Sequence, residues 1–582
     1  MKVSDYIVNF LVENKIDKVF SYIGKNAHIC DSIDKNKNIE NIFTIHEQGC
    51  GFSAEGYARA TGKTGVATAT SGPGATNLVT AVADCYFDSI PSIFIVGDVP
   101  PYECKQNRDI RQFGFQETDI VSICKPITKY ATAINSLDKL RYKLEKAYFL
   151  SRNGRKGPIV ISLPENLQFR IDFNPKKSNS FFKSKEYELL KEKSRDISRD
   201  IKKTIELINS AKRPLILVGG GVRLSNGVKE LREFLKNSNI PIVYSLMGKD
   251  AISDEYKYNL GFIGNFGTRY ANLTIANSDL LIVLGSRLDN LQTGRKIETF
   301  ARGAKIIQVD IDRGELGIRM DIDLAINYDI KEFLIKVNKL NNLSLNIKAW
   351  QEKVLEYKKT YPINYTLNGA KKIGNSIISK LSKELRDDDI ICVDVGEHQM
   401  LVAQSLKVKN NQRVLFSGGF GAMGFALPSA IGATIGTNRR AIIISGDGGF
   451  QMNIQELEII KRRNLPIKIF IINNNSLHMV KLRQDTYLEG NSVGSKKDYS
   501  VPNFKKIGKA YGIESYRVSK LKNIKKIFKK SLKNDEAQII DIEISADMTT
   551  VEPRLDFNRA FEDMKPYLSR DDLKKQMLIK LV

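Results

Sequence analysis

Residues 440–480 read RAIIISGDGGFQMNIQELEIIKRRNLPIKIFIINNNSLHMV, and this stretch decides the fold. Residues 441–445 are a short apolar run rich in β-branched side chains, which is the composition of a strand buried on both faces. Glycines and an aspartate interrupt the run at 446–449, and apolar residues at three-residue spacing over 454–460 then predict a helix with one apolar stripe. Residues 467–472 predict a second buried strand, parallel and adjacent to the first.

Two polar side chains follow these strands, at the edge where open α/β sheets bind ligands. Asp447 and Asn474 are 27 residues apart and offer a carboxylate and an amide oxygen. Together with phosphate oxygens these are ligands that Mg²⁺ prefers. The glycines let backbone amides approach a phosphate, and the helix that follows directs its positive end to the same point. An ordinary turn with Asp447 as a helix cap is the alternative, but the double asparagine and the flanking strands favour the metal site.

The GDG and NN pair resembles the thiamine-diphosphate motif of the thiamine-dependent decarboxylases and carboligases. The chain is most similar to the acetolactate synthase large subunit, over residues 3–541. The resemblance implies thiamine diphosphate and Mg²⁺ as cofactors, and an α/β fold of three doubly wound parallel-sheet domains. These are a pyrimidine-binding domain, a nucleotide-binding-like central domain and a diphosphate-binding domain, expected at residues 1–170, 200–340 and 350–545. A charged linker is expected at 171–199, and a tail at 546–582 is expected to be a lid or an oligomer contact, or else an inert surface helix.

The composition predicts several cores and no membrane span. A length of 582 residues predicts three or four domains, and no apolar run approaches the roughly 18 residues of a membrane helix. The six cysteines show no paired metal spacing and indicate reduced thiols in the cytoplasm. The net charge of +24 comes from lysines spread along the whole chain, so nucleic-acid binding is not expected and an anionic substrate or cofactor is favoured.

A glutamate at a predicted strand end of the first domain is the candidate for proton chemistry. Glu47 lies in HEQGCGFSAEGYARATG, residues 46–62, which resembles the HEQ and AEGYAR segment of acetolactate synthases. In that family the glutamate holds the aminopyrimidine of the coenzyme, whose amine then takes the proton from the thiazolium carbon. Without the resemblance, Glu47 would be an acid that compensates a helix dipole. The resemblance therefore implies that Glu47 is catalytic.

Two further segments of the first domain resemble the same family. TSGPGATN at 70–77 matches its pattern residue for residue, and the expected cofactor contacts are Ser71, Gly72, Pro73, Gly74 and Asn77. FQE at 115–117 resembles a segment near the substrate, which implies catalytic roles for Phe115 and Gln116.

The predicted third domain carries the diphosphate loops. GEHQM at 396–400 resembles the family's GQHQM loop; we expect His398 to contact the diphosphate, and Glu397, which replaces the usual Gln, to accept hydrogen bonds from backbone amides or to be protonated. SGGFGAMG at 417–424 matches SGG-x-GAMG, so Met423 is expected to be catalytic as the apolar wedge that bends the coenzyme; a core methionine is the alternative. The cofactor-binding residues expected here are Glu397, His398, Gly421, Ala422, Met423, Gly446, Asp447, Gly448, Gly449, Asn474, Ser476, Leu477, His478 and Met479, with Asp447, Asn474 and the carbonyl of Ser476 on the metal.

Glycine and acid turns follow the strand-like runs of the middle domain, a layout typical of nucleotide binding. Each turn alone is better explained as a structural βα turn. Together they resemble the FAD-binding domain of acetolactate synthases, where FAD is structural rather than redox-active, and the sequence leaves open whether FAD is bound. The residues concerned are Gly219, Gly220, Gly221, Leu246, Met247, Gly267, Gly285, Arg287, Asp310 and Asp329.

Four departures from the family fall where it shapes the acceptor pocket. Lys25, Glu165, Leu291 and Arg483 replace the family's glycine, lysine, arginine and tryptophan. An arginine and a lysine in that pocket would suit a larger or anionic acceptor, which the sequence does not name. The expected substrate-pocket residues are Lys25, Asn26, Val480 and Arg483.

The motifs and the resemblance together predict a transferase that decarboxylates a 2-keto acid, with pyruvate expected, and transfers the acyl carbanion to a carbonyl acceptor. A simple decarboxylase, an acyl transferase acting on a modified sugar and a non-catalytic homologue are the alternatives; the intact Glu47, Asp447 and Asn474 argue against the last. The resemblance also implies that the pyrimidine half of one chain meets the diphosphate half of another. A homodimer or homotetramer is therefore expected, and a regulatory small subunit is left open.

Overall fold

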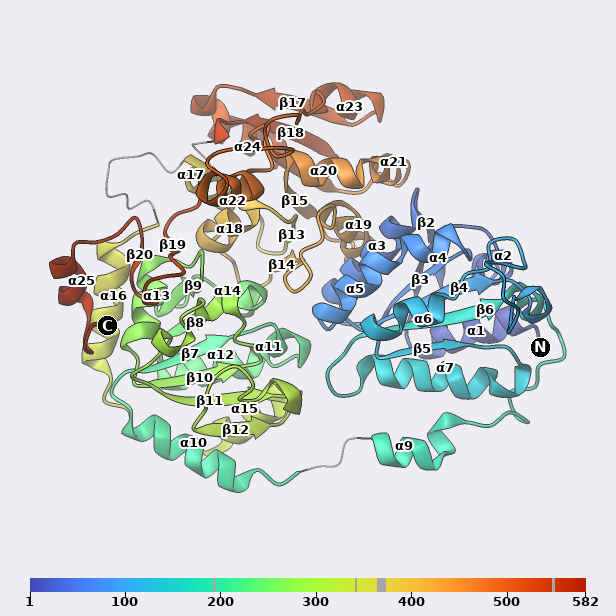
Figure 1. Cartoon of the computed structure of the whole chain (residues 1–582), viewed down its shortest axis with the longest axis horizontal. Helices are drawn as coiled ribbons and strands as arrows, with labels where there is room; N and C mark the ends of the chain where they lie inside the picture. The colour runs from blue at the N-terminus through green and yellow to red at the C-terminus, as the bar shows by residue number, and fades with distance from the viewer. Residues whose placement is uncertain (192–194, 341–342, 364–372, 547–549) are drawn as a thin grey trace.

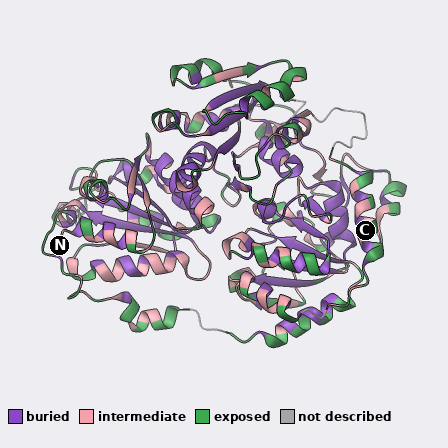
Figure 2. Ribbon diagram, turned by 180° about the vertical axis from the view of Figure 1, so that it is seen from behind, coloured by how far each residue is buried: buried purple, intermediate pink, exposed green. Residues whose placement is uncertain are grey.

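The computed structural model describes residues 1–191, 195–340, 343–363, 373–546 and 550–582. They form three six-stranded parallel sheets and a two-stranded hairpin near the C-terminus (Figure 1). Figure 2 shows that buried residues gather in the strands, while exposed residues lie on the outer helices. The predicted α/β fold with three parallel-sheet domains is confirmed. Parts of the predicted linker, third domain and tail lie outside the described residues.

The first sheet has the strand order β2-β1-β3-β4-β6-β5. Its inner strand β3 is buried along its whole length, as expected for a parallel strand covered by helices on both faces. The strands are β1 (Lys18–Ser21), β2 (Glu40–Phe43), β3 (Gly65–Ala69), β4 (Ser92–Asp98), β5 (Tyr130–Ala133) and β6 (Pro158–Pro164). The helices are α1 (Val3–Glu13), α2 (Ala27–Asp34), α3 (Glu47–Thr61), α4 (Pro73–Asn77), α5 (Val79–Phe87), α6 (Ile120–Cys124), α7 (Leu137–Arg152), α8 (Glu165–Gln168) and α9 (Lys185–Leu190).

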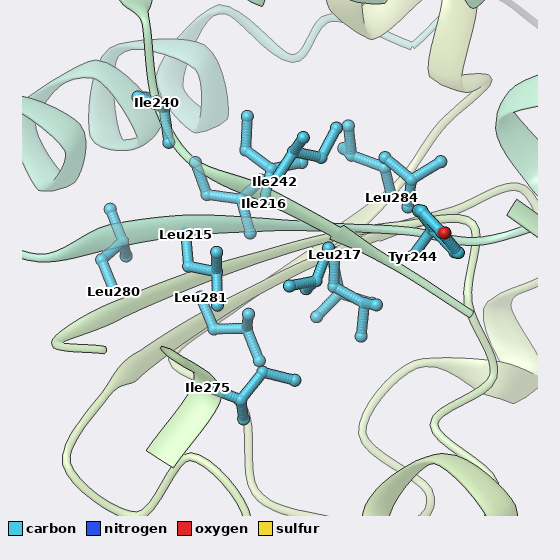
Figure 3. Packing of buried hydrophobic residues seen from close by; sticks show 14 of the residues in the cluster. Leu215, Ile216, Leu217, Ile240, Ile242, Tyr244, Ile275, Leu280, Leu281 and Leu284 are labelled. Atoms are coloured by element: carbon cyan, nitrogen blue, oxygen red, sulfur yellow. The ribbon is translucent and has the colours of Figure 1, made fainter. Parts of the chain in front are cut away.

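The middle sheet has the order β12-β11-β10-β7-β8-β9. Figure 3 shows its core, which contains apolar side chains from β7, β8 and β10 and Ile275 of α13. The strands are β7 (Pro214–Val218), β8 (Ile242–Tyr244), β9 (Asn259–Phe262), β10 (Leu280–Leu284), β11 (Lys305–Asp310) and β12 (Leu324–Asn327). The helices are α10 (Ser198–Ser210), α11 (Gly221–Leu224), α12 (Val228–Ser238), α13 (Arg269–Asn277), α14 (Asn290–Thr293), α15 (Ile330–Leu340) and α16 (Lys348–Thr360).

The third sheet, β14-β13-β15-β16-β18-β17, repeats the strand order of the first, so the first and third domains are built on the same plan. The strands are β13 (Ile390–Val393), β14 (Arg413–Phe416), β15 (Ala441–Gly446), β16 (Ile467–Asn473), β17 (Glu514–Val518) and β18 (Gln538–Glu543). The helices are α17 (Ile373–Ser382), α18 (Glu397–Ser405), α19 (Ala426–Thr437), α20 (Asp447–Met452), α21 (Leu457–Arg462), α22 (His478–Tyr487), α23 (Phe504–Ala510) and α24 (Ile524–Ser531).

The stretch that predicted the fold forms the expected strand–helix–strand unit, with β15 and β16 parallel and Ala441 opposite Ile467. The prediction of a single helix over 454–460 is wrong. The helical chain begins at Asp447 as α20 and breaks at Asn453, and a 3₁₀ turn, η7 (Ile454–Glu456), precedes α21. The Asn453 side chain donates to the backbone carbonyl of Gly424 at 2.8 Å, and such a bond competes with helix continuation.

Helices α3 and α19 cross closely and fix the first domain against the third; their labels lie side by side in Figure 1. A methyl group on Gly56 would overlap the backbone carbonyl of Ser429, and one on Gly432 would overlap that of Ser53. Each helix therefore contributes one serine and, three positions later, one glycine to the crossing. Because glycine has no Cβ, the two backbones can approach this closely.

Residues 550–582 of the tail pack along the middle domain. Glu562 is fully buried and accepts hydrogen bonds from both terminal nitrogens of Arg302, at 2.9 and 2.8 Å. The ring of Phe561 meets that of Phe300 edge-on, with centroids 5.0 Å apart. The tail contains β19 (Arg554–Leu555), β20 (Met564–Lys565) and α25 (Arg570–Gln576). This part of the tail belongs to the packing of the middle domain, and its role as a lid or an oligomer contact stays a prediction.

Candidate functional site

Asp447 is the first residue of α20 and lies directly after β15. Its Oδ2 accepts hydrogen bonds from the backbone amides of Asn474 at 2.9 Å and Asn475 at 2.7 Å, and its Oδ1 accepts one from the Tyr499 phenol at 2.6 Å. The residue is only 1% exposed, and burial raises the pKa of its carboxyl group. The carboxylate is therefore fixed where β15 and β16 end, as the sequence predicted for a metal ligand.

The loop after β16 holds the other two predicted metal ligands. Asn474 follows the strand directly, and Asn475 has a φ of 49°, a left-handed conformation that asparagine tolerates. This turn brings two successive amides to Asp447. Ser476 is buried, and its hydroxyl donates to the Ser495 carbonyl at 3.0 Å. The structure thus gathers Asp447, Asn474 and Ser476 on one edge of the sheet.

His398, the second residue of α18, packs against Gly446 of the GDG turn. Burial lowers the pKa of its imidazole to about 4, so the ring is neutral at physiological pH and carries one N–H. Its Nε2 is buried and has no hydrogen-bond partner among the described residues. A neutral imidazole with an unpaired nitrogen at this position suits a diphosphate contact.

Glu397, which begins α18, is 5% exposed. Its Oε1 accepts a hydrogen bond from the backbone amide of Val551 at 3.1 Å, which agrees with the expected bond to a backbone amide. Its Oε2 lies 3.3 Å from Nδ1 of His478, the first residue of α22. The loop before α18, the loop after β16 and the tail therefore meet at this glutamate.

The loop that carries Met423 is held from two sides. Asp88 of the first domain accepts hydrogen bonds from the amides of Gly418 at 3.0 Å and Gly419 at 2.6 Å, and Asp394 accepts one from Gly424 at 2.9 Å. The side chains of Met423, Leu477 and Tyr499 lie around Gly448 of the GDG turn. The structure thus brings the predicted wedge together with the predicted metal turn.

Glu47 begins α3 at the end of the first sheet where its strands terminate. Its Oε2 accepts a hydrogen bond from the Asn77 amide at 3.0 Å, and Gly74 lies beside its carboxylate. Ser71 is buried, and its hydroxyl lacks a partner within the described part of the chain. Gln116 lies against Gly72, and neighbouring Phe115 is 77% exposed. The residues of the predicted pyrimidine half therefore also gather at one edge, with Phe115 exposed there.

The predicted substrate-pocket residues are divided between the two domains. Lys25 is half-buried in the first domain, whereas Val480 and Arg483 are exposed on α22 of the third. Asn26 is fully buried, and its side-chain amide is hydrogen-bonded within its own domain to Tyr22, Gly24 and Thr68; its place in the substrate pocket stays a prediction.

Comparison with known proteins gives three matches along the chain. Residues 1–123 match "Thiamine pyrophosphate enzyme, N-terminal TPP binding domain", residues 201–337 the central domain of the same enzymes, and residues 394–542 their C-terminal TPP binding domain. The chain belongs to the thiamine pyrophosphate enzyme family. Acetolactate synthase 1, chloroplastic, of Nicotiana tabacum is 35% identical over 579 residues, which cover 97% of this chain and 84% of that protein. The acetolactate synthase large subunit of Lactococcus lactis subsp. lactis is 34% identical over 544 residues, covering 93% and 92%.

The residues present fit thiamine pyrophosphate. A buried polar atom without a partner costs on the order of 1–3 kcal/mol, so the hydroxyl of Ser71 and Nε2 of His398 both indicate a ligand. One atom lies in each of the two TPP-binding domains, at the loops that the family resemblance assigns to the coenzyme. Each of the two domains thus keeps an unpaired buried polar atom at a loop where the coenzyme is expected.

The central domain of this thiamine pyrophosphate enzyme borders a cavity of about 570 Å³, which all three domains line. Burial raises the pKa of Asp310, one of its lining residues, to about 6. Eight of the ten residues predicted for FAD line the cavity: Gly220, Gly221, Leu246, Met247, Gly285, Arg287, Asp310 and Asp329. Gly219 and Gly267 do not line the cavity; they pack against the backbone of Gly285 and Ile263 respectively, and their predicted role stays a prediction.

Several residues that hold the site together carry no motif in the sequence. Tyr499 fixes Asp447, and Asp88 fixes the loop before Met423. Each is separated by 52 or more residues from its partner and would be read as an ordinary polar residue. The TPP-binding domains of this family member therefore depend on contacts that only the folded chain reveals.

Across the described ranges, no helix is both long and apolar enough to cross a membrane.

Proposed function

We propose that this chain is an acetolactate-synthase-like carboligase, which uses thiamine diphosphate and Mg²⁺ to decarboxylate pyruvate and transfer the acyl unit to a carbonyl acceptor. The observation that carries the proposal is that Glu47 lies beside Asn77 and that Asp447 lies where β15 and β16 end, which supports the two proposed halves of the site. The relatives named acetolactate synthase support the same reaction class.

The roles of this chain's residues follow from their chemistry. When bound, thiamine diphosphate supplies a carbon nucleophile and an electron sink for decarboxylation. Glu47 would bond to the aminopyrimidine and control the proton there. Asp447, Asn474 and the carbonyl of Ser476 would hold Mg²⁺ on the diphosphate. His398 would contact the diphosphate, and Met423 would pack as an apolar wedge against the coenzyme.

The active unit is proposed to be a homodimer, or a homotetramer of such dimers, in which one chain's pyrimidine half meets its partner's diphosphate half. Exposed apolar side chains around both halves support this. In the first domain, the side chains of Phe113 and Phe115 are mostly exposed. In the third domain, those of Phe420, Met452 and Val480 are each about 50% exposed. Clusters of exposed apolar side chains of this kind mark interaction surfaces.

Bound FAD is proposed for the cavity between the domains. Its volume of about 570 Å³ is within the usual range for cofactor pockets. We expect the purified protein to be yellow and to release FAD on denaturation, which absorption spectroscopy and chromatography of the supernatant would measure. A colourless protein that takes up no added FAD would contradict this part of the proposal.

The acceptor is proposed to be larger than pyruvate or to carry a negative charge. Lys25 and the exposed Arg483 support this, because their cationic groups stand where the family has a glycine and a tryptophan. Free thiols at all six cysteines support a reducing compartment, and we propose the cytoplasm.

Incubation with thiamine diphosphate, Mg²⁺ and pyruvate tests the proposed reaction. We expect CO₂ release that depends on both cofactors, and addition of carbonyl acceptors should divert the acyl unit into new products. Acetolactate, measured after its conversion to acetoin, would identify pyruvate as an acceptor as well as the donor. Acetaldehyde as the sole product would favour the simple decarboxylase, and no CO₂ from any 2-keto acid would favour a non-catalytic homologue.

A further inference from the structure

Glu456 reaches from the third domain into the first. It is the last residue of η7, nine residues after Asp447, and it is fully buried. Its Oε2 accepts a hydrogen bond from the backbone amide of Ile45 at 3.2 Å, and its Oε1 accepts one from the amide of His46 at 3.0 Å. These two amides immediately precede Glu47, so the carboxylate fixes the backbone at the point where α3 begins.

The first turn of α3 is shaped to admit this carboxylate. A methyl group on Gly49 would overlap the Glu456 side chain, so the carboxylate occupies the space that a larger residue would fill. The start of a helix carries partial positive charge, which favours an anion there. Burial raises the pKa of Glu456 to about 7, and the two amides offset part of that cost.

A second contact acts beside the first. The Asn453 side chain donates to the side-chain oxygen of Gln48 at 3.0 Å and to the backbone carbonyl of Gly424 at 2.8 Å. Gln48 follows Glu47, and Gly424 follows Met423. Segment 453–456, where the helix is interrupted, therefore contacts the chain before Glu47 at Ile45 and His46 and after it at Gln48.

We infer that Glu456 is a positioning residue for Glu47, acting through the backbone amides of Ile45 and His46, with Asn453 as its assistant. The inference rests on the proposed function, in which Glu47 bonds to the coenzyme. A contact that only joined two domains could be made by apolar side chains at lower cost, because a buried carboxylate must be compensated. Here the backbone amides of Ile45 and His46, the two residues before Glu47, compensate the buried carboxylate. The orientation of Glu47 is therefore coupled to Glu456.

Glu456→Gln tests the inference because it keeps the shape and removes one of the two acceptor oxygens. We expect the exchange of the thiazolium C2 proton of bound thiamine diphosphate, followed by NMR after rapid quenching in D₂O, to slow by roughly 10–100-fold. The KM for pyruvate should change little. In the protein without coenzyme, amide hydrogen exchange of a peptide spanning 44–50 should become faster. Glu458→Gln is the matched control, since Glu458 is a half-buried glutamate on the same segment whose carboxylate pairs with Arg462.

The outcomes separate this inference from the proposed function. If Glu47→Gln left C2 proton exchange unchanged, the proposed function would fail. If Glu47→Gln slowed it but Glu456→Gln behaved like Glu458→Gln in both exchange measurements, the positioning role would be wrong. Thermal unfolding reports whether each variant folds. Should Glu456→Gln fail to fold, Asn453→Ala removes the neighbouring contact and should slow C2 exchange several-fold; an unchanged rate there would overturn the inference.

Discussion

Glu47→Gln is expected to stop the release of CO₂ from pyruvate almost completely, with kcat lowered by roughly 100–10,000-fold, the usual contribution of a positioned acid–base group. Glutamine has the same size and can still accept the hydrogen bond from Asn77, which lies at 3.0 Å in the structure. It cannot hold negative charge or exchange a proton. Steady-state CO₂ release and C2 proton exchange of the bound coenzyme would measure the loss.

Glu13→Gln serves as the matched control, because Glu13 is an exposed glutamate at the end of α1 in the same domain. Its activity should equal that of the unchanged protein. Binding of thiamine diphosphate, measured by calorimetry, should survive in Glu47→Gln, since the proposed diphosphate and metal contacts are all in the third domain. Retention of more than about a tenth of the activity would show that another group performs the proton transfer.

The strand–helix–strand unit at 440–480 was predictable because its signals are local. Uninterrupted runs of β-branched residues before and after a glycine turn predict buried parallel strands, and this prediction does not depend on the rest of the chain. The break at Asn453 was not predictable, because the side chain leaves the helix to bond Gly424 and Gln48, and Gln48 is 405 residues away. The spacing of apolar residues along a helix gives no information about such a distant partner.

Glu456 illustrates the same limit for function. In the sequence it is one of two glutamates in the predicted helix, and its two amide partners are about 410 residues away. The fold brings them together because the first and third domains meet along α3 and α19. The role of a residue that acts through a contact between domains cannot be recognised from the residues next to it in the sequence. Asp447 and Asn474, in contrast, follow strands that the sequence pattern predicts.

The glycines of the middle domain show a third limit. Gly220 lines the cavity, Gly219 and Gly267 serve close backbone packing, and Gly285 does both. In the sequence all four are glycines near strand ends, and the missing side chain is equally useful for admitting a ligand or a neighbouring backbone. Only the positions of the surrounding atoms distinguish the two uses.

Asp447→Ala is expected to abolish metal-dependent uptake of the coenzyme. Removing a residue that only hydrogen-bonds to a metal ligand usually lowers the affinity for the metal by about 10–100-fold. Loss of the carboxylate ligand itself should therefore weaken Mg²⁺-dependent binding of thiamine diphosphate by at least roughly 100-fold. The substitution also leaves the amides of Asn474 and Asn475 without their acceptor, which loosens the loop that carries the other ligands. Calorimetric titration of the coenzyme at several Mg²⁺ concentrations would measure both the affinity and its metal dependence.

Two further variants separate the metal from the fold. Tyr499→Phe keeps the Asp447 carboxylate but removes the hydrogen bond to its Oδ1 at 2.6 Å, so it should weaken Mg²⁺-dependent binding by a smaller factor, about 10-fold. Asp485→Ala removes an exposed aspartate paired with Lys481 on α22 and should have no effect. If Asp447→Ala folded normally and still bound thiamine diphosphate with unchanged dependence on Mg²⁺, then the ends of β15 and β16 would not be the metal site. The assignment of the diphosphate half would then have to be abandoned, because every other residue assigned to that half is placed by its position relative to Asp447.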